Sequence, residues 1–235
     1  MNSLCRALRS KNRGLITSYM RLRQLIGHLG IFMPLLCFLF GLICGHWPLQ
    51  DSISAYYYTN VRDLFVGILV CVGLFLVTYK GYELIDNIIT TISGIASMGI
   101  AAFPCWAPEV VGQRVGLLQL DPSVSYIVHG VCALCFFILL AVNSLFLFTK
   151  TNPDKQMTEK KKQRNMVYVV CGVIILIALA GLVLSVIFGE KWGLSSFKLM
   201  FIFETVMLVA FGISWLVKGE LILKDGKPDD GTRGT

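Results

Sequence analysis

Charged residues are scarce in this chain: Asp, Glu, Lys and Arg make up 15% of its 235 residues, whereas 55% are hydrophobic. A soluble domain of this length needs about a quarter of its residues charged to cover its surface. The shortage excludes a cytosolic enzyme and points to lipid as the solvent. The net charge of +7 does not indicate a nucleic-acid binder, because such proteins place their basic residues on a soluble face.

Motifs for catalysis and cofactor binding are also lacking. The sequence contains no P-loop, glycine-rich cofactor turn, nucleophile elbow or haem motif. It has only three histidines, and His28 is expected at the opposite end of the membrane domain from the other two, so a three-histidine zinc site cannot form. Each connection between apolar runs is shorter than about 25 residues and cannot build a core of its own. We expect no cofactor and no metal, and a function within the membrane domain or at its rim.

Six apolar runs dominate the sequence. A hydrocarbon core of about 30 Å requires roughly 20 residues of helix. In lipid, each backbone polar group must be satisfied within its segment, and runs without alternation of polar and apolar residues exclude a β-barrel. The sequence therefore predicts an all-α polytopic membrane protein, a six-transmembrane-helix bundle. The runs are 25–45, 64–79, 87–103, 124–149, 166–188 and 197–217.

The basic residues predict how the chain is oriented. If the six runs alternate across the membrane, all but four of the 21 Lys and Arg residues lie on one side. The positive-inside rule places that side, with both termini, in the cytoplasm of a plasma membrane or a bacterial inner membrane. We divide the chain into a basic cytoplasmic arm (1–24), a membrane domain (25–223) and a disordered tail (224–235) rich in Gly and Asp.

Small residues and a lysine suggest details of helix packing and helix ends. Lys218 directly after the sixth run and Gly219 beyond it are typical of a helix end, with the lysine in the last helical turn and the glycine in a left-handed cap. In the third run, small residues recur at helical spacing, which indicates close packing between helices rather than a binding surface. These residues are Thr90, Ser93, Gly94, Ser97 and Ala101.

Three ionisable residues lie inside or at the edge of an apolar run, where a charge is costly. Glu204 lies seven residues into the sixth run and must be protonated, paired or next to a wet cavity. Asp63 enters the short second run, where a site residue and a favourable carboxylate in the first helical turn are equal alternatives. His129 lies five residues into the fourth run, at a similar depth to the other two. A packing role is the alternative for this histidine.

The loop before the second run adds hydroxyl groups at the same outer level. It contains Ser52, Ser54 and three consecutive tyrosines, Tyr56 to Tyr58, which are also typical of an aromatic belt at a membrane interface. We interpret the convergence of four segments as a polar pocket that opens outward. The candidate binding residues are Ser52, Ser54, Tyr57, Asp63, His129 and Glu204.

A family resemblance involves several of these residues. Ser52-Ile53-Ser54 and Asp63 around the start of the second run, Pro104-Cys105 after the third, and the segment 129–137 in the fourth resemble the six-span FRAG/DRAM/Sfk-like superfamily. The similarity is greatest to its branch of uncharacterised bacterial membrane proteins. The resemblance implies a six-helix bundle and a link to lipid organisation, remodelling of lipid-anchored proteins or membrane stress. It supplies no catalytic residues.

Three functions remain as alternatives. A lipid-binding or membrane-organising protein is the preferred one, with membrane lipids as partners and self-association into a homo-oligomer left open. The second is a metal-dependent lipid hydrolase similar to the alkaline ceramidases, in which His46, His129, Asp63 and Glu204 would form a mixed site. A transporter has the least support, because no inverted repeat and no broken helix are visible. The sequence leaves open whether the protein is an enzyme.

Overall fold

A computed structural model describes residues 2–81, 83–151, 157–188, 191 and 198–224 of the chain. These residues form helices and no strands, as predicted for the fold class. In chain order the helices are α1 (Asn2–Gly45), η1 (Ser54–Tyr58), α2 (Arg62–Thr78), α3 (Leu84–Ala102), η2 (Pro108–Val110), α4 (Pro122–Val142), η3 (Asn143–Leu147), α5 (Glu159–Phe188) and α6 (Leu199–Lys218).

Among the described residues, five helices are long and apolar enough to cross a membrane. They are α1 from Thr17, α3, α4 together with the π-helical turn η3, α5, and α6. The helix formed by the second apolar run, α2, has 17 residues and a length of about 25 Å at 1.5 Å per residue. The chain is therefore a membrane-embedded helical protein with five spans of sufficient length and one shorter apolar helix.

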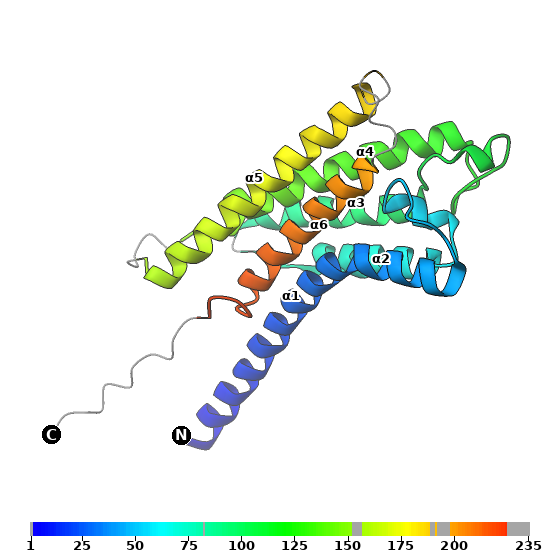
Figure 1. Cartoon of the computed structure of the whole chain (residues 1–235). Helices are drawn as coiled ribbons and strands as arrows, with labels where there is room; N and C mark the ends of the chain where they lie inside the picture. Colours follow the sequence, from blue (N-terminus) through cyan, green and yellow to red (C-terminus); the bar gives the residue numbers. More distant parts are fainter. Residues whose placement is uncertain (1, 82, 152–156, 189–190, 192–197, 225–235) are drawn as a thin grey trace.

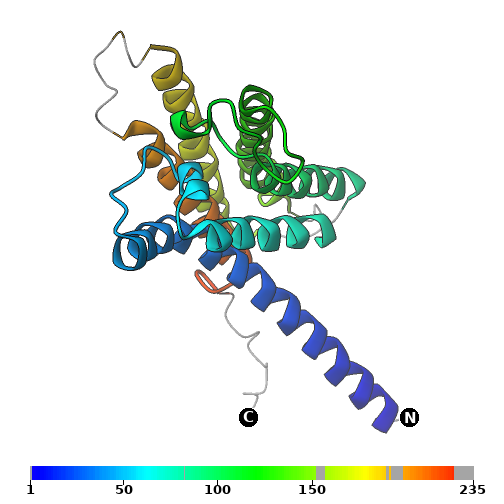
Figure 2. The same ribbon diagram turned by 90° about the vertical axis from the view of Figure 1, so that its right-hand side faces the viewer.

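From α2 to α6 each helix packs against its neighbours in sequence, and α1 packs mainly against α6 and more loosely against α2, which closes a ring. Figure 1 shows the bundle from the side, and Figure 2 turns the loop-bearing end toward the viewer. We call the end that carries η1 and the start of α6 the η1 end. The opposite end, where α4 gives way to Lys150, is the Lys150 end.

Helix α1 is much longer than a single span. It runs for 44 residues, bends along its length, and extends past the rest of the bundle at the Lys150 end in both views (Figures 1 and 2). Pro34 lies within the helix, and proline is a cause of helix bending because it removes one helical hydrogen bond and clashes with the preceding turn. The boundary at 24/25 expected from composition lies inside this continuous helix. The tail beyond residue 224 lies outside the described residues.

Two glycine contacts set the closest approaches between helices. A Cβ atom at Gly94 in α3 would lie 2.5 Å from the carbonyl oxygen of Gly73 in α2. In the same way, a Cβ atom at Gly212 in α6 would lie 2.5 Å from the carbonyl oxygen of Gly27 in α1. The stripe of small residues in α3 is buried, as predicted, and Ser97 donates a 2.8 Å hydrogen bond to the Leu69 carbonyl oxygen. These positions serve packing.

The end of α6 differs from the prediction in one detail. The helix ends at Lys218, but Gly219 has an ordinary φ of −82°. The left-handed conformation falls instead on Glu220, with a φ of 53°. The backbone N–H groups of Gly219 and Glu220 bond to the Trp215 and Val217 carbonyl oxygens, so the carbonyl groups at the helix end are satisfied without a left-handed glycine.

Candidate functional site: a polar junction at the η1 end

The loop between α1 and α2 folds inward over the η1 end of the bundle. Ile53, Tyr56 and Tyr57 in this loop are buried, and Figure 2 shows η1 in cyan beside the start of α6 in orange. The Ser52 hydroxyl accepts a 3.0 Å hydrogen bond from the backbone N–H of Ala55, a local turn that starts η1. Apolar burial therefore draws the loop in, and local bonds shape it.

Helix α6 holds this loop through three contacts. The Glu204 carboxylate accepts a hydrogen bond of 2.5 Å from the Ile53 backbone N–H. Near the start of α6, the Phe201 backbone N–H donates to the Asp51 carbonyl oxygen at 3.0 Å, and Lys198 forms an ion pair with the Asp51 carboxylate. The costly carboxylate of the sixth run thus has a backbone donor as its partner.

Helix α4 reaches the same loop through His129, whose side chain is 6% exposed. Its Nδ1 atom lies 2.7 Å from the Phe103 carbonyl oxygen, and its Nε2 atom lies 3.1 Å from the Ser54 hydroxyl oxygen. A carbonyl oxygen can only accept, so Nδ1 carries the proton in the neutral ring. The lone pair of Nε2 then accepts a hydrogen bond from Ser54. We call Ile53, Ser54, Phe103, His129 and Glu204 the polar junction.

A small cavity of about 30 Å³ borders the polar junction. Ser54 and Glu204 are its ionisable or hydroxyl-bearing residues, and the other lining side chains are apolar, including Phe65, Phe136 and Phe137. This volume matches one water molecule and is far below that of a lipid or a drug-sized ligand. The cavity can hold a water next to Ser54, but it does not enclose an amphiphile.

Of the six predicted site residues, the structure brings three together: Ser54, His129 and Glu204. Ser52 is buried nearby and bonds within its own turn. The hydroxyl of Tyr57 accepts a 2.6 Å hydrogen bond from Arg62, whose guanidinium lies 4.3 Å from the centre of the tyrosine ring. Its role is therefore to fix the start of α2.

Asp63 does not join the junction, which corrects the prediction that it approaches His129 and Glu204. Its side chain is exposed in the first turn of α2, where the partial positive charge of the helix start favours a carboxylate. It forms none of the junction's hydrogen bonds among the described residues. The alternative interpretation as a helix-start residue fits this position.

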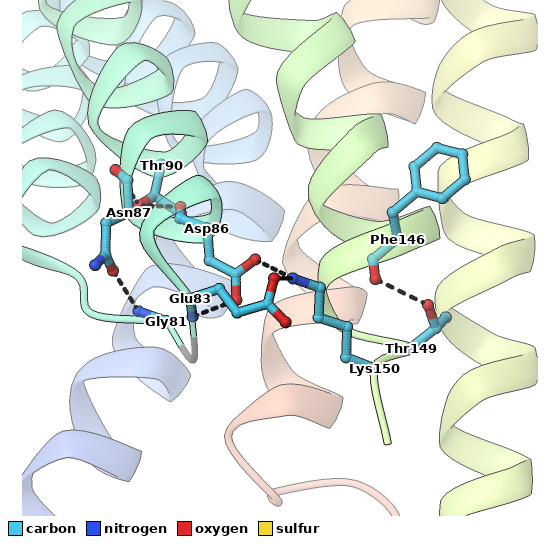
Figure 3. Close-up of polar contacts among 8 residues, drawn as sticks. All are labelled: Gly81, Glu83, Asp86, Asn87, Thr90, Phe146, Thr149 and Lys150. Atoms are coloured by element: carbon cyan, nitrogen blue, oxygen red, sulfur yellow. Dashed lines mark hydrogen bonds and ion pairs between the residues drawn. The ribbon is translucent and has the colours of Figure 1, made fainter. Parts of the chain in front are cut away.

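A second polar cluster, at the Lys150 end, was not predicted from the sequence. Figure 3 shows Lys150 reaching the carboxylates of Asp86 in α3 and of Glu83, the residue that caps this helix. The Lys150 Nζ atom lies 2.6 Å from Asp86 and 2.8 Å from Glu83. Glu83 and Asp86 also form a reciprocal capping box at the start of α3. The hydrogen bond to Asp86, followed by the one to Glu83, raises the pKa of Lys150 above its ordinary value. The spacing Glu-x-x-Asp before an apolar run is the signal that could have revealed the cap.

A polar cavity of about 10 Å³ lies beside this cluster, lined by residues that include Asp86, Asn143 and Lys218. The Oδ1 atom of Asn143 is buried and has no hydrogen-bond partner among the described residues. The cavity has room for about one water, which would supply the missing donor. The arrangement is typical of a structural hydration site that joins α3, α6 and the end of α4.

Metal binding finds no support in this geometry. Within the part of the chain that the structure describes, no group of three His, Cys, Asp or Glu side chains could hold a metal ion. His46, the second histidine of the hypothetical mixed site, is exposed just beyond α1. No family model matches the chain, and no curated protein or solved structure is significantly similar to it.

Proposed function

We propose that the chain is a six-span integral membrane protein with cytoplasmic termini that binds the headgroup and ester region of a membrane lipid at the polar junction. The observation that carries the proposal is the convergence of a carboxylate, an imidazole and a hydroxyl from three segments at one end of an apolar bundle. Such groups are costly in lipid, which makes an ionisable residue there a candidate functional site. A membrane-organising role would follow from holding lipid at this position.

The six-span topology is supported by the ring. Helix α2 packs against α1 and α3, and its apolar sequence is compatible with a further span in a locally thinned bilayer. An even number of spans puts both termini on one side. The excess of Lys and Arg in the arm, the α4–α5 connection and the tail supports the cytoplasm as that side, with the η1 end outside.

Lipid access to the junction is supported by the apolar side chains around it. On α4, Ile127 and Val131 flank His129 and are 63% and 62% exposed. On α6, Ile202 and Val206 flank Glu204 and are 48% and 38% exposed. Because these residues form the outer faces of helices whose inner faces carry the polar groups, acyl chains can lie against them while the lipid ester reaches the rim of the junction.

The resemblance to the FRAG/DRAM/Sfk-like superfamily remains part of this proposal, since its lipid-related roles agree with a lipid site. A metal-dependent hydrolase is the weaker candidate, because the described residues offer no metal-binding group.

The topology is tested by cysteine labelling in intact cells. Single cysteines are introduced at Gly112, in the α3–α4 connection, and at Met157, before α5, in a chain without its native cysteines. We expect an impermeant maleimide to label position 112 and to leave position 157 unlabelled until the cells are opened. Labelling of position 157 from outside would overturn both the orientation and the outward junction.

The lipid site is tested with a phosphatidylcholine analogue that carries a diazirine near its ester and a clickable tag. After irradiation in membranes, we expect crosslinked peptides from η1 and the first turns of α6. The Lys150 end serves as the internal control, because it offers no such junction. Crosslinks spread evenly over all helices, or absent from η1 and α6, would contradict the proposal.

A further inference from the structure

We propose that Ser54 and His129 are a nucleophile and general base that transfer acyl groups from ester-bearing membrane lipids. This inference rests on the proposed function, because a lipid ester must reach the polar junction. It adds a covalent reaction that lipid binding alone does not require.

The direction of the hydrogen bonds supports the assignment. The Phe103 carbonyl oxygen holds the proton of His129 on Nδ1 at 2.7 Å, and Nε2 faces the Ser54 hydroxyl at 3.1 Å. This is the tautomer in which imidazole can take the serine proton, with a third group fixing the ring. A backbone carbonyl fills here the orienting role that an aspartate has in the familiar triads.

Other buried serines in the described part of the chain show how a packing serine behaves. Ser97 and Ser125 donate to the carbonyl oxygens of Leu69 and Pro104, at 2.8 and 2.9 Å. Ser52, two residues before Ser54, accepts from a backbone N–H in its own turn. Ser54 instead bonds to an imidazole 75 residues away in sequence. A hydroxyl that needed only to be satisfied could donate to a backbone carbonyl, as Ser97 and Ser125 do.

The position of Ser54 is also fixed by a second helix, α6. Glu204 of α6 bonds to the backbone N–H of Ile53, the preceding residue. This contact holds the serine segment between α4 and α6 and makes Glu204 a positioning residue. The 30 Å³ cavity borders both Ser54 and Glu204, so one water can stand beside the nucleophile.

The reaction balances without an external oxidant or reductant. The Ser54 oxygen attacks the ester carbonyl carbon, and the serine proton passes to Nε2 of His129. The ester C–O bond breaks, and the leaving alcohol takes that proton, which leaves an acyl ester on Ser54. A water molecule, or the hydroxyl of a second lipid, then attacks the acyl ester and gives its proton to His129. The acyl group leaves as a fatty acid or a new ester, and the Ser54 hydroxyl is restored.

The test uses an alkyl fluorophosphonate, which phosphonylates activated serines, on the full chain in membranes. We expect labelling at Ser54, located by peptide mass spectrometry. Ser54→Ala should abolish the label, whereas the matched control Ser52→Ala should keep it. His129→Gln should slow labelling by about 100-fold or more, because a general base contributes that much. Glu204→Gln, which keeps an acceptor for Ile53 but loses the charge, should slow labelling less than His129→Gln does.

Labelling that is absent from the native protein, or unchanged in His129→Gln, would overturn the inference. A thermal unfolding midpoint equal to that of the native protein shows that each variant is folded. If glutamine at position 129 disrupts the junction, His129→Gly is used instead, and added imidazole should restore its labelling. The photoactivatable lipid separates this failure from that of the proposed function. Crosslinking at η1 without fluorophosphonate labelling leaves lipid binding standing and removes catalysis, whereas loss of both removes both.

Discussion

At the η1 end, Glu204 and His129 bond to loop residues that lie 151 and 75 positions away in sequence. The His129 bond is buried, and the Glu204 bond is partly buried, with its donor on the buried residue Ile53. At the Lys150 end, Glu83 and Asp86 first satisfy their own helix start, and the lysine that joins them has a side chain 29% exposed. At the Lys150 end, water can reach the partly exposed lysine and replace its partner. At the η1 end, water replaces a lost hydrogen-bond partner less easily. The comparison shows that the two ends differ in what the loss of a partner costs.

The largest expected effect is on the alkylation rate of the Cys105 thiol. Burial, and to a smaller extent the charge of Glu204, raises the pKa of Cys105 to about 12 from an ordinary 9.0. Only the thiolate reacts, so alkylation of Cys105 at pH 8 should be about 1000-fold slower than that of a thiol with an ordinary pKa. Mass spectrometry after maleimide treatment in detergent measures this rate. The exposed Cys44, free like Cys105, is the reference in the same sample.

The pH dependence of the Cys105 alkylation rate follows from the direction of its pKa shift. Because the pKa is raised, the rate at Cys105 should keep rising with pH well above 9, until the thiol ionises. After denaturation the two cysteines should react alike. Equal rates at Cys44 and Cys105 in the folded protein would mean that the η1 end is wet, and the contrast between the ends would fail.

The next effect comes from removing the carboxylate that holds the loop. Glu204→Leu leaves the Ile53 backbone N–H without its partner, and an unsatisfied buried donor costs about 1–3 kcal/mol. We expect a lower thermal unfolding midpoint in detergent and faster proteolysis between α1 and α2. Glu204→Gln is the matched control, because its amide oxygen can accept the same hydrogen bond. Equal losses in the two variants would show that charge, and not the acceptor, matters here.

The smallest effect is expected at the Lys150 end. Lys150→Met removes an ion pair in which the side chains of Lys150 and Glu83 are 29% and 62% exposed, so solvent screening limits their contribution. The buried Asp86 carboxylate loses its cation but keeps its capping hydrogen bond from the Glu83 backbone N–H. The raised pKa of Lys150 means that the pair's stabilisation is complete below the ordinary lysine pKa and is lost as pH rises through the folded value. The midpoint difference between native protein and variant should therefore stay constant from pH 7 to 9. A difference that vanished within that range would contradict the assignment.

The helices could be predicted largely because hydrophobicity is a local property. The run 197–217 became α6 (Leu199–Lys218), and the run 64–79 became α2 (Arg62–Thr78). Glu204 was found for the same reason, since the cost of a carboxylate in an apolar run can be read without knowing its partner. The partner itself, a backbone N–H 151 residues away, leaves no mark in the sequence.

The missed cluster illustrates the opposite case. Asp86 lies one residue before the apolar run that was counted as the third span, so its burial cost was not considered. Its lysine comes from a connection 64 residues later, and only the fold brings the two together. The expected approach of Asp63 to His129 failed because similar depth in the membrane does not fix which way a side chain points around its helix.

The seam between α1 and α6 has a consequence for biogenesis. The first and last helices of the ring meet at Gly27 and Gly212, so their contact cannot form until synthesis has passed α6. At 5–20 residues per second, α1 waits about 10–40 s for α6. During that time the Gly27 face is open to lipid or to other nascent helices. The arrival of α6 closes this face and also delivers Glu204 to Ile53, so completion of the ring and completion of the polar junction are a single late event.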